Sequence, residues 1–238
     1  MDFDISPLLI TLKIATVSTC FTFFLGILCA RLAYPVKKCR FLIDGILSLP
    51  MVLPPTVVGF FLLIIFGKNS AIGRVLSAMG ISVVFTWQGA VIAAIVVSFP
   101  IMYITTLGAF EQMDTELIDA ARTLGFSERA IFFKVWIPLS WPGIAAGTTL
   151  SFARSLGEFG ATIMIAGNLP GKTRTMSTAV YSAMQGGNRE LAYSWVIIIM
   201  LISLCTLVLM NFISSRRYTR DERKRSVAKR LGLFGRQQ

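Results

Sequence analysis

The sequence predicts an all-α membrane protein, a polytopic helical bundle of about five transmembrane helices. Of its 238 residues, 55% are hydrophobic and only 15% are charged, whereas soluble globular domains usually carry about 25% charged residues. Several stretches without Asp, Glu, Lys or Arg are long enough to cross the ~30 Å hydrocarbon core of a bilayer. The chain has no histidine, and its four cysteines show no CxxC spacing. We therefore expect no metal, no cofactor and no His-based catalysis.

Glycines, prolines and polar clusters divide the apolar stretches into five predicted spans. They cover residues 8–30, 41–66, 83–107, 142–166 and 192–213. Together, residues 1–213 form the predicted transmembrane domain, and residues 214–238 form a basic tail. The N-terminal MDFDISP has no basic residue, so the first span is expected to be a retained helix and not a cleaved signal peptide. The segment 68–81 is expected to be a short helix at the membrane interface.

The distribution of basic residues predicts the orientation of the chain. Sixteen of the 23 Lys and Arg residues fall in segments 31–40, 108–141 and the tail from 214, whereas five fall in the opposite connections. Because cytoplasmic segments carry the excess of basic residues, we expect the N-terminus outside and the C-terminus in the cytoplasm. The tail has few aromatic residues on which bases would stack, so anionic membrane lipid is its expected partner, and nucleic acid is not.

The loop 108–141 has the pattern of two short helices. Asp114 is a suitable N-cap, and Glu116 and Asp119 lie early in the helix that follows. Their negative charges interact favourably there with the positive end of the helix dipole. Gly125 suits the left-handed position that ends a helix, and Ser127 is a suitable cap for the next one. An apolar stripe at helical spacing comprises Leu117, Ile118, Ala121 and Leu124. We expect Pro138 to end the second helix, and a soluble partner with a hydrophobic groove to cover the stripe.

The same loop resembles the "EAA" loop of ABC importer permeases. Asp119, Ala120 and Ala121 are followed after three residues by Gly125, and after nine more by Val-Trp-Ile-Pro ending at Pro138. The family pattern is Glu-Ala-Ala, three residues, Gly, nine residues and Ile-x-Leu-Pro, so the spacing matches and three substitutions are conservative. The resemblance implies a coupling helix that docks on a separate ATP-hydrolysing subunit. The alternative is an ordinary pair of interfacial helices.

Three further stretches resemble the molybdate branch of these permeases. They are LPMVLPPT at 49–56, SFARSLGEFGA at 151–161 and NLPGKTRT at 168–175. The resemblance covers most of residues 8–213 and implies a type I ABC importer permease fold in the inner membrane of a bacterium. It also implies two ATPase subunits, a second copy of the chain and a periplasmic oxyanion-binding protein as partners. Tungstate and sulfate or thiosulfate permeases of the same class remain alternatives.

Two features of the predicted spans are candidates for the translocation pathway. Pro50, Pro54 and Pro55 lie near the middle of the second span, where each removes a backbone donor and should bend or open the helix. Broken helices near the midplane commonly line transporter pathways. Arg154 and Glu158 lie at i and i+4 in the fourth span, and we expect them to neutralise each other. Either the pair is an electrostatic gate for an anion, or it is a structural ion pair.

Lys172, Thr173 and Arg174 lie in the outer connection 167–190. We expect them to contact the anion or its binding protein. Gly143 and Gly147 allow close helix approach, either within the bundle or against a second copy. The chain has no P-loop, so we expect a transporter subunit and not an enzyme. Five spans are few for a complete pathway, so we expect a homodimer whose two copies line one pathway between them. A proton-coupled secondary carrier is a rival, although the spans contain few acidic residues.

Overall fold

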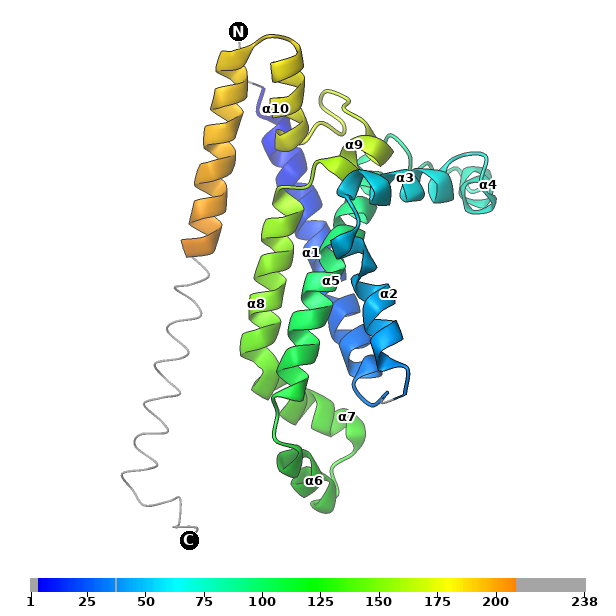
Figure 1. Cartoon of the computed structure of the whole chain (residues 1–238), viewed down its shortest axis with the longest axis vertical. Coiled ribbons are helices and arrows are strands. Elements are labelled where there is room, and N and C mark those ends of the chain that lie inside the picture. Colours follow the sequence, from blue (N-terminus) through cyan, green and yellow to red (C-terminus); the bar gives the residue numbers. More distant parts are fainter. Residues whose placement is uncertain (1–3, 37, 209–238) are drawn as a thin grey trace.

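The computed structural model describes residues 4–36 and 38–208, and this part of the chain consists of helices and their connections without strands (Figure 1). Four helices are long and apolar enough to cross a membrane, or five when one bent pair is counted as a span. The four are α1 (Ser6–Ala33), α5 (Trp87–Glu111), the continuous helix Glu128–Leu156 and the helix Arg189–Val208. The basic tail and the last residues of the predicted fifth span lie outside the described residues.

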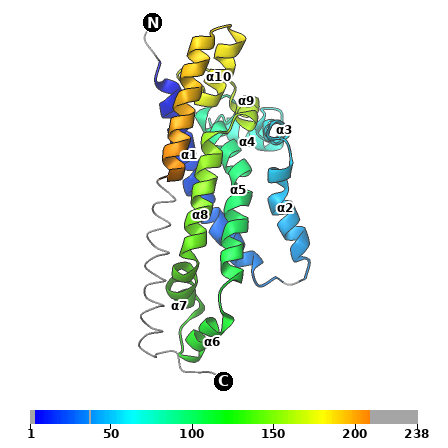
Figure 2. The same cartoon turned by 60° about the vertical axis from the view of Figure 1, so that its left-hand side comes forward.

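The centre of the bundle is formed by α1, α5 and α8 (Ile137–Leu156), which run side by side in both views (Figures 1 and 2). Small residues of α8 bring it close to α5. A Cβ added to Gly143 would lie 2.5 Å from the Cβ of Ala109, and one added to Gly147 would lie 2.1 Å from Oγ1 of Thr105. These two glycines therefore serve packing within the bundle, which was one of the two predicted alternatives.

The second predicted span is broken into two helices. α2 (Arg40–Val52) and α3 (Pro55–Phe66) meet at an angle of 105°. The break falls at Pro54 and Pro55, because two consecutive prolines remove adjacent donors and hold the preceding residues extended. Pro50, in contrast, lies inside α2 without ending it. The short helix α4 (Ala71–Ala78) follows, and Ser70 Oγ caps it by accepting a hydrogen bond from the Gly73 N–H.

The fourth predicted span differs most from expectation. The prediction that Pro138 ends a helix is wrong, because α7 (Glu128–Ile131), the π-helix η1 (Phe132–Trp136) and α8 form one continuous helix. Pro138 lies inside this continuous helix, directly after the π-helix, and the wider turn of the π-helix relieves the clash of the proline ring with a preceding carbonyl. The span predicted over 142–166 is likewise interrupted, because α8 ends at Leu156 and α9 (Gly160–Ala166) follows as a separate helix.

The remaining connection contains α10 (Met176–Gln185), at the end of the bundle opposite α6 (Thr115–Thr123) and α7 (Figure 1). Thr175 and Thr178 form a reciprocal capping box at its start. The Met176 N–H donates to Oγ1 of the buried Thr11 at 2.8 Å, and this bond ties α10 to α1. The bundle therefore has one end built from α6 and α7 and an opposite end built from α3, α4, α9 and α10 (Figure 2).

Candidate coupling hairpin and broken helices

We define the hairpin as residues 114–131, which contain α6 (Thr115–Thr123) and α7. Its predicted caps are confirmed. Asp114 Oδ1 accepts a hydrogen bond from the Glu116 N–H at 2.9 Å, and Ser127 Oγ accepts one from the Ala130 N–H at 3.3 Å. Each cap satisfies a donor that the first turn of a helix leaves without a partner. Glu116 itself is exposed in that first turn.

Gly125 ends α6 as predicted, with a φ of +80°. The Gly125 N–H donates to the Arg122 carbonyl at 2.9 Å, and the Phe126 N–H donates to the Ala121 carbonyl at 3.1 Å. This pair of bonds is the Schellman motif, which requires a left-handed residue at the position of Gly125. A side chain at Gly125 would meet no neighbouring atom, so the backbone conformation, and not space, favours glycine there.

The predicted apolar stripe of the hairpin is divided between two faces, and its description as one exposed stripe is wrong. Ile118 and Ala121 are 4% and 9% exposed and pack into a core cluster at this end of the bundle. Leu124, in contrast, is 77% exposed, and Leu117 and Ala120 are exposed as well. The four residues cover about 120° around the helix, and the core covers only the side that carries Ile118 and Ala121. We call the exposed side, Leu117, Ala120 and Leu124, the hairpin patch.

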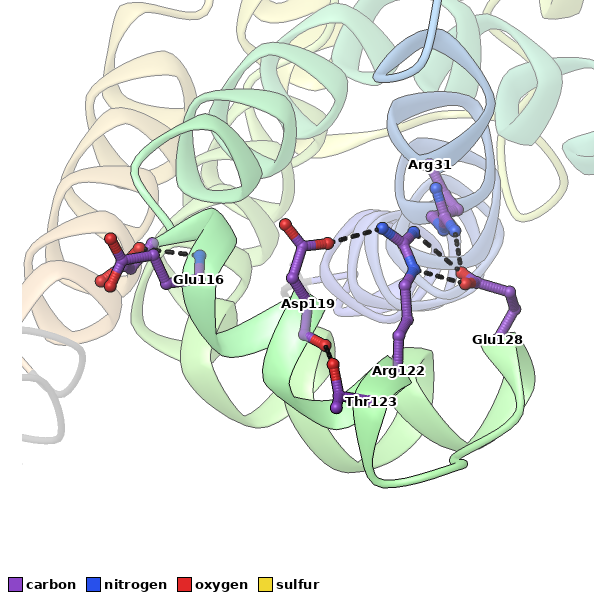
Figure 3. A network of polar contacts seen from close by, with 7 residues as sticks. Arg31, Glu116, Asp119, Arg122, Thr123 and Glu128 are labelled. Carbon is purple, nitrogen blue, oxygen red and sulfur yellow. Dashed lines mark hydrogen bonds and ion pairs between the residues drawn. The ribbon is translucent and has the colours of Figure 1, made fainter.

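Charged side chains join the two helices of the hairpin (Figure 3). Arg122 donates from Nε to Glu128 Oε1 at 2.7 Å and from Nη1 to Asp119 Oδ1 at 3.0 Å. The hydrogen bond from Arg122 lowers the pKa of the Glu128 carboxyl below its usual range. Arg31, at the end of α1, reaches the same carboxylate, with Nη2 3.6 Å from Oε2. Asp119 thus lies in a network that connects α6, α7 and α1.

The intramembrane ion pair forms, but it spans a break and not one continuous helix. Arg154 lies in the last turn of α8, and Glu158 lies in the connection to α9. The Arg154 Nη1 atom is 2.7 Å from Glu158 Oε2, and Glu158 Oε1 accepts the Ala161 N–H at 2.8 Å. The side chain of Glu158 is 2% exposed, whereas that of Arg154 is 31% exposed. The carboxylate is therefore held from two sides, while the guanidinium is partly open.

The second halves of the two broken spans pack against each other. A Cβ added to Gly59 of α3 would lie 2.7 Å from the Cα of Ala161 in α9, and one added to Gly160 would lie 3.0 Å from the Cβ of Pro55. Glycine at both positions lets the backbones approach closely. The contact brings the proline break beside the Arg154–Glu158 pair, so the structure unites two candidate pathway features that are about 100 residues apart in the sequence.

The three outer-face candidates have different environments. Lys172 is exposed, whereas Thr173 is buried and its Oγ1 accepts the Leu169 N–H at 3.0 Å. Thr173 therefore closes a turn and does not face outward. Arg174 is half-buried, its Nε donates to Asn168 Oδ1 at 3.0 Å, and it borders a pocket of about 450 Å³.

A second charged cluster at the hairpin end of the bundle was missed in the sequence. Arg40 pairs with Asp44 one turn later at 3.4 Å and with Glu111 at the end of α5. The buried Tyr103 hydroxyl donates to Asp44. The i, i+4 spacing of Arg40 and Asp44 is a signal that sequence analysis can detect, but the two partners on α5 are not detectable in that way.

Comparison with known proteins places the chain in a family. The family described as "Binding-protein-dependent transport system inner membrane component" matches residues 22–218. The molybdenum transport system permease protein ModB of Escherichia coli K12 is 43% identical over 214 residues, which cover 87% of this chain and 92% of that protein. The sulfate transport system permease protein CysT of Salmonella typhimurium is 35% identical over 211 residues, covering 87% of this chain and 75% of that protein.

Solved structures share the fold at lower identity. A permease chain of a bacterial alginate ABC importer superposes with a TM-score of 0.73 at 21% identity, covering 89% of this chain and 79% of that chain. A chain of the MetNI methionine ABC transporter in an inward-facing conformation superposes with a TM-score of 0.70 at 18% identity. The match covers 88% of this chain and 94% of that chain. The predicted fold class is therefore confirmed as that of ABC importer permeases. The chain belongs to the family of binding-protein-dependent inner-membrane transport components, and it is a multi-pass subunit of such a transporter.

Proposed function

We propose that this chain is the membrane-spanning subunit of an ATP-driven importer that carries molybdate into the bacterial cell. The observation that carries the proposal is the similarity to a molybdenum permease over nearly the full length of both chains. The sulfate permease is less similar and is matched over a smaller share of its length, so sulfate is the second candidate. Molybdate and sulfate are both tetrahedral dianions, and a delivering protein that binds one of them would supply much of the selectivity.

The hairpin is the proposed docking element for a separate ATPase. Its patch presents Leu117, Ala120 and Leu124 on one face of α6, and Glu116 and Asp119 border it with negative charge. Exposed apolar residues rimmed by charge suit a groove on a soluble partner. Gly125 ends α6, and Pro138 lies in the continuous helix that leads from the hairpin into the bundle. The acidic residues would pair with basic residues of the ATPase.

The proposed orientation has the hairpin in the cytoplasm, the N-terminus outside and the C-terminus inside. It rests on the excess of basic residues on the hairpin side of the sequence. The opposite end, with Lys172 and Arg174, would then face the periplasmic oxyanion-binding protein. Both side chains carry the charge that attracts an acidic surface or the anion itself.

Two copies of the chain would line one pathway, because four or five spans per chain are few for a complete channel. Helices α2, α3 and Arg189–Val208 expose apolar faces in the single chain, and a second copy or lipid would cover them. We place the pathway beside the break at Pro54 and Pro55, where Arg154 and Glu158 also lie. There the partly open guanidinium of Arg154 would act on a passing anion while it stays paired with Oε2 of the buried Glu158.

The test is stimulation of ATP hydrolysis by the assembled complex in proteoliposomes, with the binding protein and each anion in turn. We expect molybdate to stimulate hydrolysis and to accumulate, and sulfate to do so poorly. Stimulation by sulfate with no response to molybdate would assign the chain to the sulfate class. Uptake that needs a proton gradient and no ATPase would overturn the importer assignment altogether.

A further inference from the structure

Arg31, in the last turn of α1, contacts three residues of the helix that leads from the hairpin into the bundle. Its Nη2 lies 3.6 Å from Oε2 of Glu128. Its guanidinium carbon lies 4.5 Å from the ring centre of Trp136 and 5.9 Å from that of Phe132. We call Arg31 and these three residues the inner joint. None of the four residues stands out as functional in the sequence alone.

The π-helix brings the three partners of Arg31 onto one line. In a regular α-helix each step of four residues advances about 40° beyond a full turn, so Glu128 and Trp136 would diverge by about 80°. The π-helix spans Phe132–Trp136 and contains more residues per turn, so it reverses part of that advance. A single planar side chain on α1 can therefore contact all three. The π-helix therefore aligns the three side chains that contact Arg31, and π-helical segments are frequent at functional sites.

The Trp136 ring is a fixed surface for the Arg31 guanidinium. Trp136 is buried, and its ring meets those of Tyr34 and Phe110 edge to face, with centres 4.6 Å and 5.1 Å away. A guanidinium over an indole ring is held by the ring quadrupole and by planar stacking, which a lysine ammonium reproduces poorly. The ion pair to Glu128 is more exposed, so it is screened by water and contributes less.

The joint continues into the hairpin through Arg122. Glu128 accepts from Arg122, which also binds Asp119 beside the hairpin patch (Figure 3). A displacement of α6 is therefore passed through charged contacts to Glu128 and from there to α1. Ile118 and Ile131 pack with Ile27 and Ala30 of α1 in one core cluster, so apolar contacts also hold the hairpin beside α1. The contact of Arg31 with the Trp136 ring adds a polar link between the same elements.

We propose that Arg31 is a positioning residue that makes α1 move with the hairpin, so that ATPase movements reach the bundle. The expected effect on transport rests on the proposed function. The contact between α1 and the hairpin is independent of that function. Loss of the joint should leave ATP hydrolysis running while less anion is carried for each ATP consumed. Arg31 touches neither substrate nor nucleotide, and it acts only through Trp136 and Glu128.

The experiment compares Arg31→Gln, Arg31→Lys and Glu128→Gln in the full complex, with the exposed Lys38→Gln as the matched control. Lys38 lies in the connection that follows α1, and its substitution removes the same charge. Two quantities are measured. Amide hydrogen exchange of residues 128–136 reports the joint in the membrane-embedded chain, and the ratio of anion taken up to ATP hydrolysed reports coupling.

We expect both Arg31 variants to assemble and to hydrolyse ATP, with exchange of 128–136 raised and uptake per ATP lowered about five- to tenfold. Glu128→Gln should have a smaller effect, and Lys38→Gln none. Unchanged exchange and coupling in Arg31→Lys would overturn the proposal, as would a proportional loss of hydrolysis and uptake in both Arg31 variants. If the unaltered complex carries no molybdate, the proposed function fails, while the exchange data still support or overturn the joint.

Discussion

Replacing Ala120 by aspartate should separate docking of the ATPase from folding of the hairpin. Ala120 is exposed on the hairpin patch, whereas its neighbour Ala121 is 9% exposed and faces the core cluster. A carboxylate at 120 stays hydrated in the isolated chain, so we expect a loss of stability of only about 1 kcal/mol, from the lower helix propensity of Asp and the like charge of Glu116 one turn earlier. In the docked complex the same carboxylate would be desolvated without a partner, at a cost of about 2–4 kcal/mol.

That cost corresponds to a loss of affinity for the ATPase of about 30- to 1000-fold. The assay is titration of the ATPase onto the chain in lipid nanodiscs, with the thermal unfolding of the chain alone as the measure of folding. Ala120→Ser is the matched control, because it keeps the size of the side chain and adds no charge. Ala121→Asp should instead lower the unfolding temperature of the chain, since its carboxylate enters the core cluster.

Binding of the Ala120→Asp chain to the ATPase within about twofold of the unaltered chain would contradict this prediction, because the loss of one interface contact has a larger effect. Unfolding of Ala120→Asp as readily as Ala121→Asp would contradict it as well, because the two faces of α6 would then be equivalent.

Three further outcomes follow from the packing and the charges. Gly147→Ala should destabilise the bundle by about 1–3 kcal/mol in thermal unfolding, because its Cβ would lie 2.1 Å from a hydroxyl of α5, whereas Gly108→Ala has open space and should not. Arg154→Ala should cost about 2–3 kcal/mol by stranding a buried carboxylate, and added Glu158→Gln should restore stability but not anion uptake. Protection of the hairpin amides, measured as hydrogen exchange corrected for the pH dependence of the intrinsic rate, should fall as the pH drops below the ordinary Glu value of 4.5, since the lowered pKa of Glu128 makes its ion pair stabilising above that value; Glu128→Gln should remove this dependence.

Local signals in the sequence predicted much of the hairpin and of the second span. Asp114, Gly125 and Ser127 act through hydrogen bonds that join residues at most five positions apart. Their roles can therefore be predicted from residue type and spacing. The same holds for Pro54 and Pro55, whose effect on the backbone is covalent. The fold class followed from composition and apolar stretches, which depend on the bilayer and not on detailed packing.

Features that depend on distant contacts were missed or misplaced. Pro138 reads as a helix stop, but the π-helix before it accommodates the ring. The inner joint requires the end of α1 to meet a residue 105 positions later in sequence, Trp136, and no periodicity indicates that contact. Thr173 looked available at the outer face, yet its hydroxyl closes a turn. In each case tertiary geometry decided between conformations that the local sequence allows.

The most direct test of the account is the position of the hairpin tip in intact membranes. Leu124→Cys in a chain whose four native cysteines are replaced by serine places one reactive thiol on the hairpin patch. We predict labelling by a membrane-impermeant maleimide only after the cytoplasmic side is opened, and a crosslink to the ATPase when that subunit is present. Labelling from the outside of intact cells, or a thiol that crosslinks to lipid alone, would contradict the proposal that the hairpin couples this subunit to an ATPase.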